Sequence, residues 1–226
     1  MDPAEVSQRA ERVRNRIDDA GGDPDQIAIV AVTKGFDSSA VEAAAGAGLT
    51  LIGENYAQEM LSKLSQLQPE IRDGIQTHFI GRLQTNKVRQ LSGAVDVWQS
   101  MDRMRLVAEI ARRSPGAGVF LQLDVSGTGT QGGCAVSVAP ALLAEARQAG
   151  LDVKGCMAIG PQGPTSEIAA AFAEVTRFAD DYSLHHRCMG MSADLEAAIK
   201  AGSTMVRIGT ALFGPRSTRV AHSGAN

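Results

Sequence analysis

The chain is poor in aromatic residues and carries no excess of positive charge. Aromatic side chains make up 4% of its 226 residues, too few for the stacking platforms on which single-stranded nucleic acids bind. The 22 lysines and arginines are balanced by 25 aspartates and glutamates, so the chain also lacks the basic footprint of a nucleic-acid-binding protein or a polybasic membrane patch. We therefore expect no nucleic-acid partner and no membrane partner.

Cysteines are scarce, and long apolar runs are missing. Three widely spaced cysteines, Cys134, Cys156 and Cys188, suggest neither a disulfide framework nor a CxxC metal motif, and no histidine pair has metal-ligand spacing. No apolar run approaches the roughly 20 residues of a membrane span, and the N-terminus has no apolar signal core. We therefore expect a reduced, soluble, cytoplasmic protein without a metal site.

What the chain does contain is a regular alternation of apolar, β-like runs with amphipathic helical stretches. The β-like runs lie at 27–33, 50–53, 77–80, 94–98, 118–125, 153–159, 184–188 and 204–208. Helical patterns lie at 4–19, 38–47, 55–67, 84–91, 102–113, 139–149, 166–180 and 192–201. Strands that alternate with helices indicate a parallel sheet, and eight strands are the number that closes a barrel. The pattern predicts a single-domain (β/α)8 TIM barrel over residues 1–216, with an extra N-terminal helix and a disordered tail at 217–226; an open doubly wound sheet is the alternative.

Lys34 directly follows the first apolar run and is the most informative residue of the chain. A lysine is rarely buried without a partner, and at the carboxyl end of a core strand it points into the mouth of a barrel, where ligands bind. Desolvation there would lower the pKa of the amine and make it a nucleophile toward a carbonyl group. The simpler interpretation is a strand-terminal lysine whose amine reaches water.

Two glycine-containing turns offer a place for an anion. Ser192 follows Gly190 and Met191 at an expected helix start, where unpaired backbone N–H groups favour negative charge, although an ordinary N-cap serine is the alternative. Gly209, after Arg207, lets the backbone approach a ligand closely, and Thr210 supplies a hydroxyl and an N–H. In a barrel these are the loops after the last two strands, which often hold a phosphate. A lysine and two such turns together indicate a phosphorylated aldehyde cofactor.

The stretch 127–132 matches the dinucleotide fingerprint G-x-G-x-x-G. That motif requires a helix directly after it, whereas Cys134 to Val138 is β-rich and the next helix begins near Pro140. We therefore interpret the stretch as a barrel loop. A dinucleotide-dependent oxidoreductase is a third hypothesis that rests on this match alone.

From about Ile27 to Arg216 the chain resembles the pyridoxal 5′-phosphate (PLP) homeostasis proteins, single-domain relatives of the alanine racemase barrel. The stretches that carry the resemblance are 31–34 (AVTK), 53–59 (GENYAQE), 78–87 (HFIGRLQTNK), 189–192 (MGMS) and 203–214. The resemblance implies a (β/α)8 barrel with PLP bound as a Schiff base to Lys34. One difference is that a lysine-bearing loop, usual in the family after the fifth strand, reads Thr-Gln-Gly-Gly at 130–133.

The resemblance also implies roles for the other site residues. Ser192, Gly209 and Thr210 would hold the phosphate, Arg207 would face the pyridine nitrogen, Asn55 would lie near the ring, and Met191 would form part of the pocket wall. His78 and Asn86 lie in matching stretches, but a packed strand residue and a helix cap are the simpler interpretations.

The implied site favours a carrier over a catalyst. A guanidinium can only donate hydrogen bonds, so Arg207 would keep the pyridine nitrogen unprotonated and the ring a poor electron sink. The racemase relatives take a second base, a tyrosine, from a further domain that we expect this chain to lack. Its own tyrosines are Tyr56 and Tyr182; neither sits at an obvious strand end, and Tyr56 is expected to pack on a helix. We predict a non-catalytic protein of intracellular PLP homeostasis, monomeric, with PLP-dependent apo-enzymes as possible partners; a weak PLP-dependent amino-acid racemase is the alternative.

Overall fold

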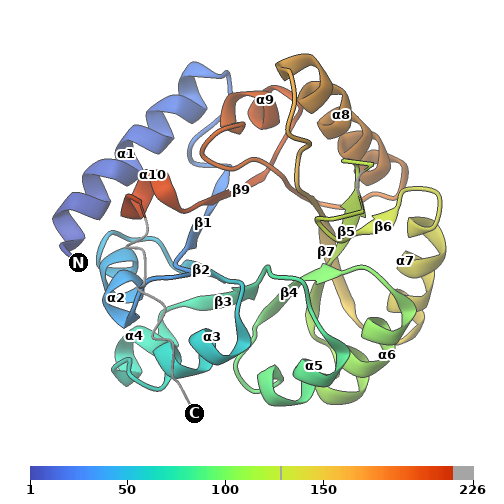
Figure 1. Ribbon diagram of the computed structural model, residues 1–226, viewed down its shortest axis with the longest axis horizontal. Helices are drawn as coiled ribbons and strands as arrows, with labels where there is room; N and C mark the ends of the chain where they lie inside the picture. Colours follow the sequence, from blue (N-terminus) through green and yellow to red (C-terminus); the bar gives the residue numbers. More distant parts are fainter. Residues whose placement is uncertain (128, 216–226) are drawn as a thin grey trace, which may run out of the picture.

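Parallel strands close into a barrel in the computed structural model, which describes residues 1–127 and 129–215 (Figure 1). The strands are β1 (Ala28–Val32), β2 (Leu51–Glu54), β3 (Gln76–Phe79), β4 (Val97–Met101), β5 (Gly118–Asp124), β6 (Cys134–Ala135), β7 (Asp152–Ala158), β8 (His186–Cys188) and β9 (Met205–Ile208). Neighbours pair in the order β4-β3-β2-β1-β9-β8-β7-β5, and a β4–β5 pairing closes the ring. The predicted barrel is thus confirmed, and the open doubly wound sheet is wrong. The short β6 pairs with β5; it lies in the stretch Cys134 to Val138, which the sequence indicated as β-rich but which was not counted among the eight strands.

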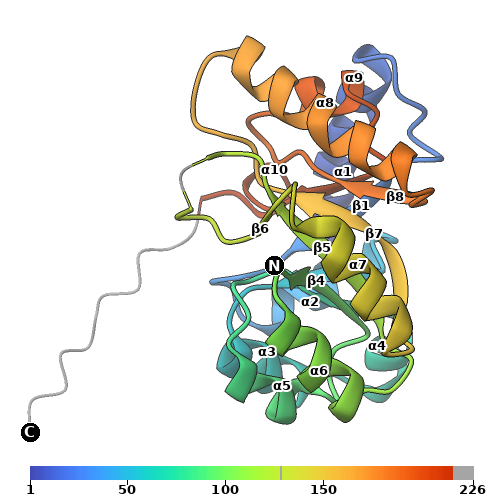
Figure 2. The same cartoon turned by 90° about the vertical axis from the view of Figure 1, so that its right-hand side faces the viewer.

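Helices surround the barrel. They are α1 (Pro3–Asp19), α2 (Ser38–Gly46), α3 (Ala57–Leu64), α4 (Pro69–Asp73), α5 (Thr85–Leu91), α6 (Met104–Arg113), α7 (Ala139–Gln148), α8 (Thr165–Asp181), α9 (Leu195–Lys200) and α10 (Thr210–Phe213). In the side view, α1, α8 and α9 cover one flank, and α3, α5 and α6 cover the opposite one (Figure 2). The short helices α4 and α10 were not predicted, and the expected tail at 217–226 lies outside the described residues.

The extra N-terminal helix was predicted correctly, and its sequence explains how it docks. Its buried residues Val6, Ala10, Val13 and Ile17 recur every three to four positions and form one apolar face. Pro3 occupies its first turn, and the carboxylate of its N-cap, Asp2, accepts a hydrogen bond from the backbone N–H of Ala4. Burying one such aliphatic side chain contributes about 1.5–3 kcal/mol, so this face suffices to hold α1 against the barrel.

The strands are buried on both faces, as their continuous apolar runs require. One set of side chains fills the barrel interior: Val30, Val97, Phe120, Met157, Cys188 and Met205. The alternate residues of the same strands pack under the helices, as Ile29 and Ala31 of β1 do beside α1 and α2. None of the helices within the described residues has the length and apolar character needed to span a bilayer. The closed barrel brings the carboxyl ends of all its strands to one rim.

Candidate functional site

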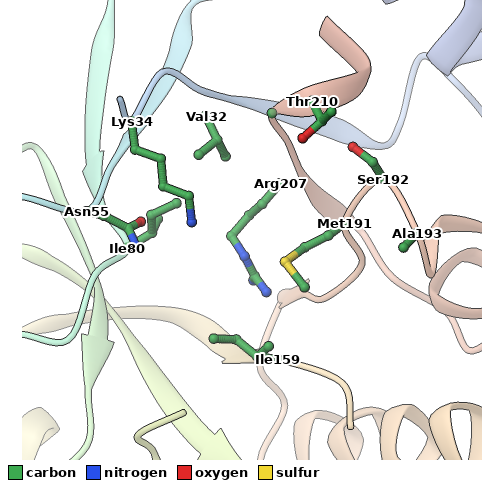
Figure 3. A pocket seen from close by; sticks show the side chains of 11 residues that line it. Val32, Lys34, Asn55, Ile80, Ile159, Met191, Ser192, Ala193, Arg207 and Thr210 are labelled. Atoms are coloured by element: carbon green, nitrogen blue, oxygen red, sulfur yellow. The ribbon is translucent and has the colours of Figure 1, made fainter. Parts of the chain in front are cut away.

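A cavity of about 290 Å³ opens at this rim, where Figure 3 shows its lining side chains. Every residue assigned to the cofactor from the sequence lines it: Lys34, Asn55, Met191, Ser192, Arg207, Gly209 and Thr210. Its volume lies near the lower end of the range for small-molecule sites, which begins at ~300 Å³. Segments far apart in the chain therefore meet at one site large enough for a small cofactor.

Lys34 extends into the cavity from the turn that follows β1. Val32 and Lys34 are two residues apart and both project inward (Figure 3), as expected for extended chain. The backbone N–H of Phe36 donates to the carbonyl oxygen of Thr33 (3.1 Å), and Gly35 has a φ of 81°. This is the geometry of a type II turn, which favours glycine at its third position. The prediction that Lys34 points into the barrel mouth is confirmed.

The two glycine turns meet on the opposite wall of the cavity. Ser192 Oγ accepts a hydrogen bond from the backbone N–H of Ala211 (3.3 Å), which connects the turn after β8 to the one after β9. The expected helix start at Ser192 is wrong, because α9 begins at Leu195 with Asp194 as its N-cap. Arg16 of α1 donates to the carbonyl oxygen of Ser192 (3.0 Å) and fixes this turn from outside. Ser192 and Thr210 both line the cavity, and Figure 3 shows their side chains on this wall.

Arg207 is buried in the floor of the cavity, with 4% of its surface exposed. Its Nη2 donates to the carbonyl oxygen of Ala158 at the end of β7 (2.7 Å), and its Nη1 donates to that of Cys188 at the end of β8 (2.7 Å). A buried guanidinium needs such acceptors, since it stays protonated. These carbonyls hold the guanidinium in a fixed orientation between the walls.

A line of hydrogen bonds continues from Arg207 through the barrel interior. Arg207 Nη1 donates to Cys188 Sγ (3.1 Å), the thiol donates to Gln99 Oε1 (3.2 Å), and Gln99 Nε2 lies 2.7 Å from His78 Nδ1. His78 Nε2 lies 3.0 Å from Gln76 Oε1. Burial raises the pKa of the Cys188 thiol, which keeps its proton, and lowers the pKa of His78 to about 4, which keeps the ring neutral. The neutral ring therefore accepts at Nδ1 and donates at Nε2, so every donor in the line points the same way.

The low pKa of His78 predicts that the protein loses stability in mild acid. In the unfolded chain the His78 ring takes up a proton near pH 6.5, whereas in the folded chain its pKa is about 4. The contribution of neutral His78 to stability is therefore complete above pH 6.5 and is lost as the pH decreases toward 4. A shift of this size corresponds to about 3 kcal/mol. Urea unfolding between pH 7 and pH 4 should show this loss, and His78→Asn, which keeps an acceptor for Gln99, should flatten the profile. An equally steep profile in the variant would contradict the assignment.

Asn55 supplies the clearest sign that a polar ligand belongs in the cavity. Its Oδ1 is buried and has no hydrogen-bond partner, which costs about 1–3 kcal/mol unless a donor satisfies it. Its backbone is fixed by the loop after β3, because a Cβ at Gly81 would lie 2.1 Å from the carbonyl oxygen of Asn55. The orphaned acceptor, the lysine amine and the hydroxyl pair form a donor and acceptor set that fits PLP.

Four cavity residues were missed by the sequence analysis: Val32, Ile80, Ile159 and Ala193. Three of them could have been found from position alone. Val32 is the last residue of β1, and Ile80 and Ile159 directly follow β3 and β7, so all three occupy the rim where barrel ligands bind.

Other candidates from the sequence lie outside the cavity. His78 is a buried strand residue, as its simpler interpretation held. Asn86 lies within α5 and does not cap it, because the N-cap is Gln84. Tyr56 is 54% exposed and lies at the N-cap of α3, and its packing on a helix stays a prediction. The G-x-G-x-x-G stretch precedes β6, not a helix, which removes the structural context of a dinucleotide site.

Fold and cavity together define a class of protein: a parallel (β/α)8 barrel with a lysine at the end of its first strand, facing the loops after its last two strands. The family model of the alanine racemase N-terminal domain matches residues 2–217. A pyridoxal phosphate homeostasis protein of Pseudomonas aeruginosa is 40% identical over 222 residues, which cover 93% of this chain and 94% of that protein. The chain therefore belongs to the alanine racemase N-terminal domain family, and within it to the pyridoxal phosphate homeostasis proteins.

Two further relatives support the same assignment. A pyridoxal phosphate homeostasis protein of Escherichia coli K12 is 35% identical, over 94% of this chain and 97% of its own length. The solved structure of PipY from Synechococcus elongatus PCC7942 with PLP bound superposes with a TM-score of 0.78 at 28% identity, and the match covers 92% of this chain and all of PipY.

Proposed function

We propose that this chain binds PLP as a Schiff base on Lys34 and serves PLP homeostasis in the cytoplasm as a non-catalytic, monomeric carrier. The observation that carries the proposal is the convergence on one cavity of an amine, an orphaned amide oxygen, a fixed guanidinium and two hydroxyls. The PLP-bound PipY structure supports the choice of cofactor. PLP-dependent apo-enzymes are the recipients that such a carrier would supply.

Each residue has a separate task in this proposal. Lys34 would supply the amine that joins the aldehyde carbon in a C=N bond, and the carbonyl oxygen would leave as water with the two amine hydrogens. Ser192 and Thr210 donate their hydroxyls to the phosphate, with Gly209 allowing close approach of the backbone. Arg207 donates toward the pyridine nitrogen. PLP supplies an electron sink when it is bound, and a nitrogen that only accepts a hydrogen bond keeps that sink weak.

The positions of the tyrosines support a carrier over a racemase. Neither tyrosine of the chain lines the cavity. Tyr56 lines a neighbouring depression with Arg82 and Lys87, which shares Asn55 with the cavity. Tyr182 packs on Phe178 at the end of α8. Racemisation needs a second base on the far face of the substrate, and these placements give it none from a tyrosine.

A purified, PLP-loaded sample tests the proposal. After borohydride reduction, peptide mass spectrometry should locate the pyridoxyl group on Lys34, and a group on another lysine would refute the assignment. The same sample, incubated with L-alanine in deuterium oxide, should incorporate deuterium at Cα far more slowly than the 1–10³ s⁻¹ that is typical of enzymes. Incorporation within that range would instead favour a catalyst, the racemase alternative.

A further inference from the structure

A buried polar cluster lies directly behind Lys34, on the opposite side of β1 and β2 from the cavity. It consists of Thr33, Glu54, Glu59 and Lys63, and we name it the Lys63 cluster. Lys63 Nζ lies 2.7 Å from Glu54 Oε1 and 2.6 Å from Glu59 Oε1. The Lys63 side chain is 4% exposed, the Glu54 side chain 3%, and the Glu59 side chain 16%. An ion pair this deeply buried is costly to desolvate, so its presence calls for a role.

The cluster holds the backbone on both sides of Lys34. Lys63 Nζ donates to the carbonyl oxygen of Thr33 (2.6 Å), immediately before Lys34. Glu59 Oε1 accepts from the backbone N–H of Gly35 (2.5 Å), immediately after it. The hydroxyl of Thr33 donates to Glu54 Oε1 (2.5 Å), which fixes the preceding residue a second time. The type II turn that carries Lys34 is thus clamped from behind by charged groups.

Strand geometry explains why the clamp does not enter the cavity. Side chains alternate along extended chain, so Val32 and Lys34 face the cavity while Thr33 faces outward, toward α3. Glu54 ends β2 and faces the same way, and Glu59 and Lys63 are an i,i+4 pair on α3. The turn is held without consuming any group that lines the cavity.

We propose that Glu59, Lys63 and Glu54 are positioning residues that fix the Thr33–Gly35 turn and so aim the Lys34 amine at the cofactor aldehyde. Attack on a carbonyl is sensitive to placement, and an error of about 1 Å can cost on the order of 100-fold. The hydrogen bonds of the cluster join its own members and the Thr33–Gly35 turn, and they do not reach Arg207 or the turns after β8 and β9. Glu54 directly precedes Asn55 of the cavity lining, whereas Glu59 contacts Gly35 and Lys63. Glu59 is therefore the member whose removal should act at the lysine end of the site. This inference rests on the proposed function.

Glu59→Ala tests the inference with two ligands that differ only at the reacting carbon. PLP carries the aldehyde, whereas pyridoxine 5′-phosphate carries an alcohol there and keeps the same ring and phosphate. We expect Glu59→Ala to weaken PLP binding by roughly 10- to 100-fold and to leave pyridoxine 5′-phosphate binding unchanged. Glu59→Gln keeps an oxygen acceptor for Gly35, so its PLP affinity should lie between that of Glu59→Ala and that of the wild type. Equal effects on the two ligands, or no effect on either, would overturn the inference.

A readout without cofactor separates this inference from the proposed function. In the unliganded protein, Glu59→Ala should speed hydrogen exchange at the Gly35 amide by about tenfold, since a hydrogen bond to a charged acceptor is lost. Unchanged hydrogen exchange at the Gly35 amide in Glu59→Ala would overturn the inference, even if PLP attaches to Lys34. Faster exchange at Gly35, in a protein whose Lys34 never attaches PLP, would refute only the proposed function.

Two further variants serve as a control and as a substitute for Glu59→Ala. Glu109→Ala removes a hydrogen-bonded carboxylate on α6, outside the cavity lining, and should change none of the readouts. If Glu59→Ala fails to fold, Thr33→Val, which deletes only the hydroxyl contact to Glu54, should give the same selective loss of PLP binding to a smaller extent. Equal weakening of both ligands in Thr33→Val would count against the inference.

Discussion

Lys34→Ala is expected to abolish the absorption band that PLP gives at the edge of the visible range when it is bound to a lysine. Lys34 is the only lysine that lines the cavity, among the described residues. The phosphate and ring contacts remain in the variant, but the covalent bond cannot form. We expect PLP affinity to fall by at least about 100-fold, because the gain from an intramolecular, well-oriented reaction is lost. Absorption spectroscopy and equilibrium dialysis with PLP measure the two effects.

Lys87→Ala is the matched control for this substitution. Lys87 lies on the same rim but lines the neighbouring depression with Tyr56, so its removal should leave the band and the affinity unchanged. Pyridoxine 5′-phosphate should bind Lys34→Ala about as well as it binds the wild type. If the absorption band of bound PLP persists in Lys34→Ala, the amine that binds PLP is another one, and the proposed function is refuted.

Lys63→Met should produce the largest loss of stability of any single substitution considered for this protein. Glu54 and Glu59 would then share a buried site without their cation. Removing one partner of a buried pair costs about 3–5 kcal/mol, because the remaining charge is uncompensated. Urea unfolding at neutral pH would measure the difference. Lys154→Met, which breaks an exposed pair with Asp152, should change stability by no more than about 1 kcal/mol.

The pH dependence of the Lys63→Met effect gives a second test. Burial already raises the pKa of Glu54 above its ordinary 4.5, with Lys63 opposing that rise, so loss of the lysine should raise it further. A carboxyl group with a raised pKa in the folded state destabilises the protein only as the pH increases above the unfolded value. The deficit of the variant relative to wild type should therefore shrink between pH 7 and pH 4.5. A constant deficit would mean that Glu54 is not the uncompensated charge.

Local sequence patterns were sufficient for the barrel and for most of its site. The alternation of apolar runs with amphipathic helices is a local signal, and the apolar run before Lys34 fixes which strand carries the amine. The rim position of Ser192, Arg207 and Thr210 follows from the same rule, since strand ends of a parallel barrel share one edge. The predicted residues therefore meet in one cavity although more than 150 positions separate Lys34 from Ser192.

The ends of helices and the shortest elements were less predictable from the sequence. Ser192 has the chemistry of an N-cap, but residues 192–194 form a further turn before α9 begins. The Ser192 hydroxyl instead accepts a hydrogen bond from the backbone N–H of Ala211 in α10. The helix α10 and strand β6 are too short to leave a periodic pattern, so only tertiary contacts define them.

The sequence by itself determined the fold class, the lysine that extends into the cavity and the loops that surround it, because each depends on residues close together in the chain. Tertiary structure alone decided two features. The hydrogen-bond line from Arg207 to Gln76 joins side chains of β9, β8, β4 and β3, which meet only when the barrel closes. The Lys63 cluster depends on the docking of α3 against the ends of β1 and β2, where burial turns ordinary surface residue types into an ion-paired clamp.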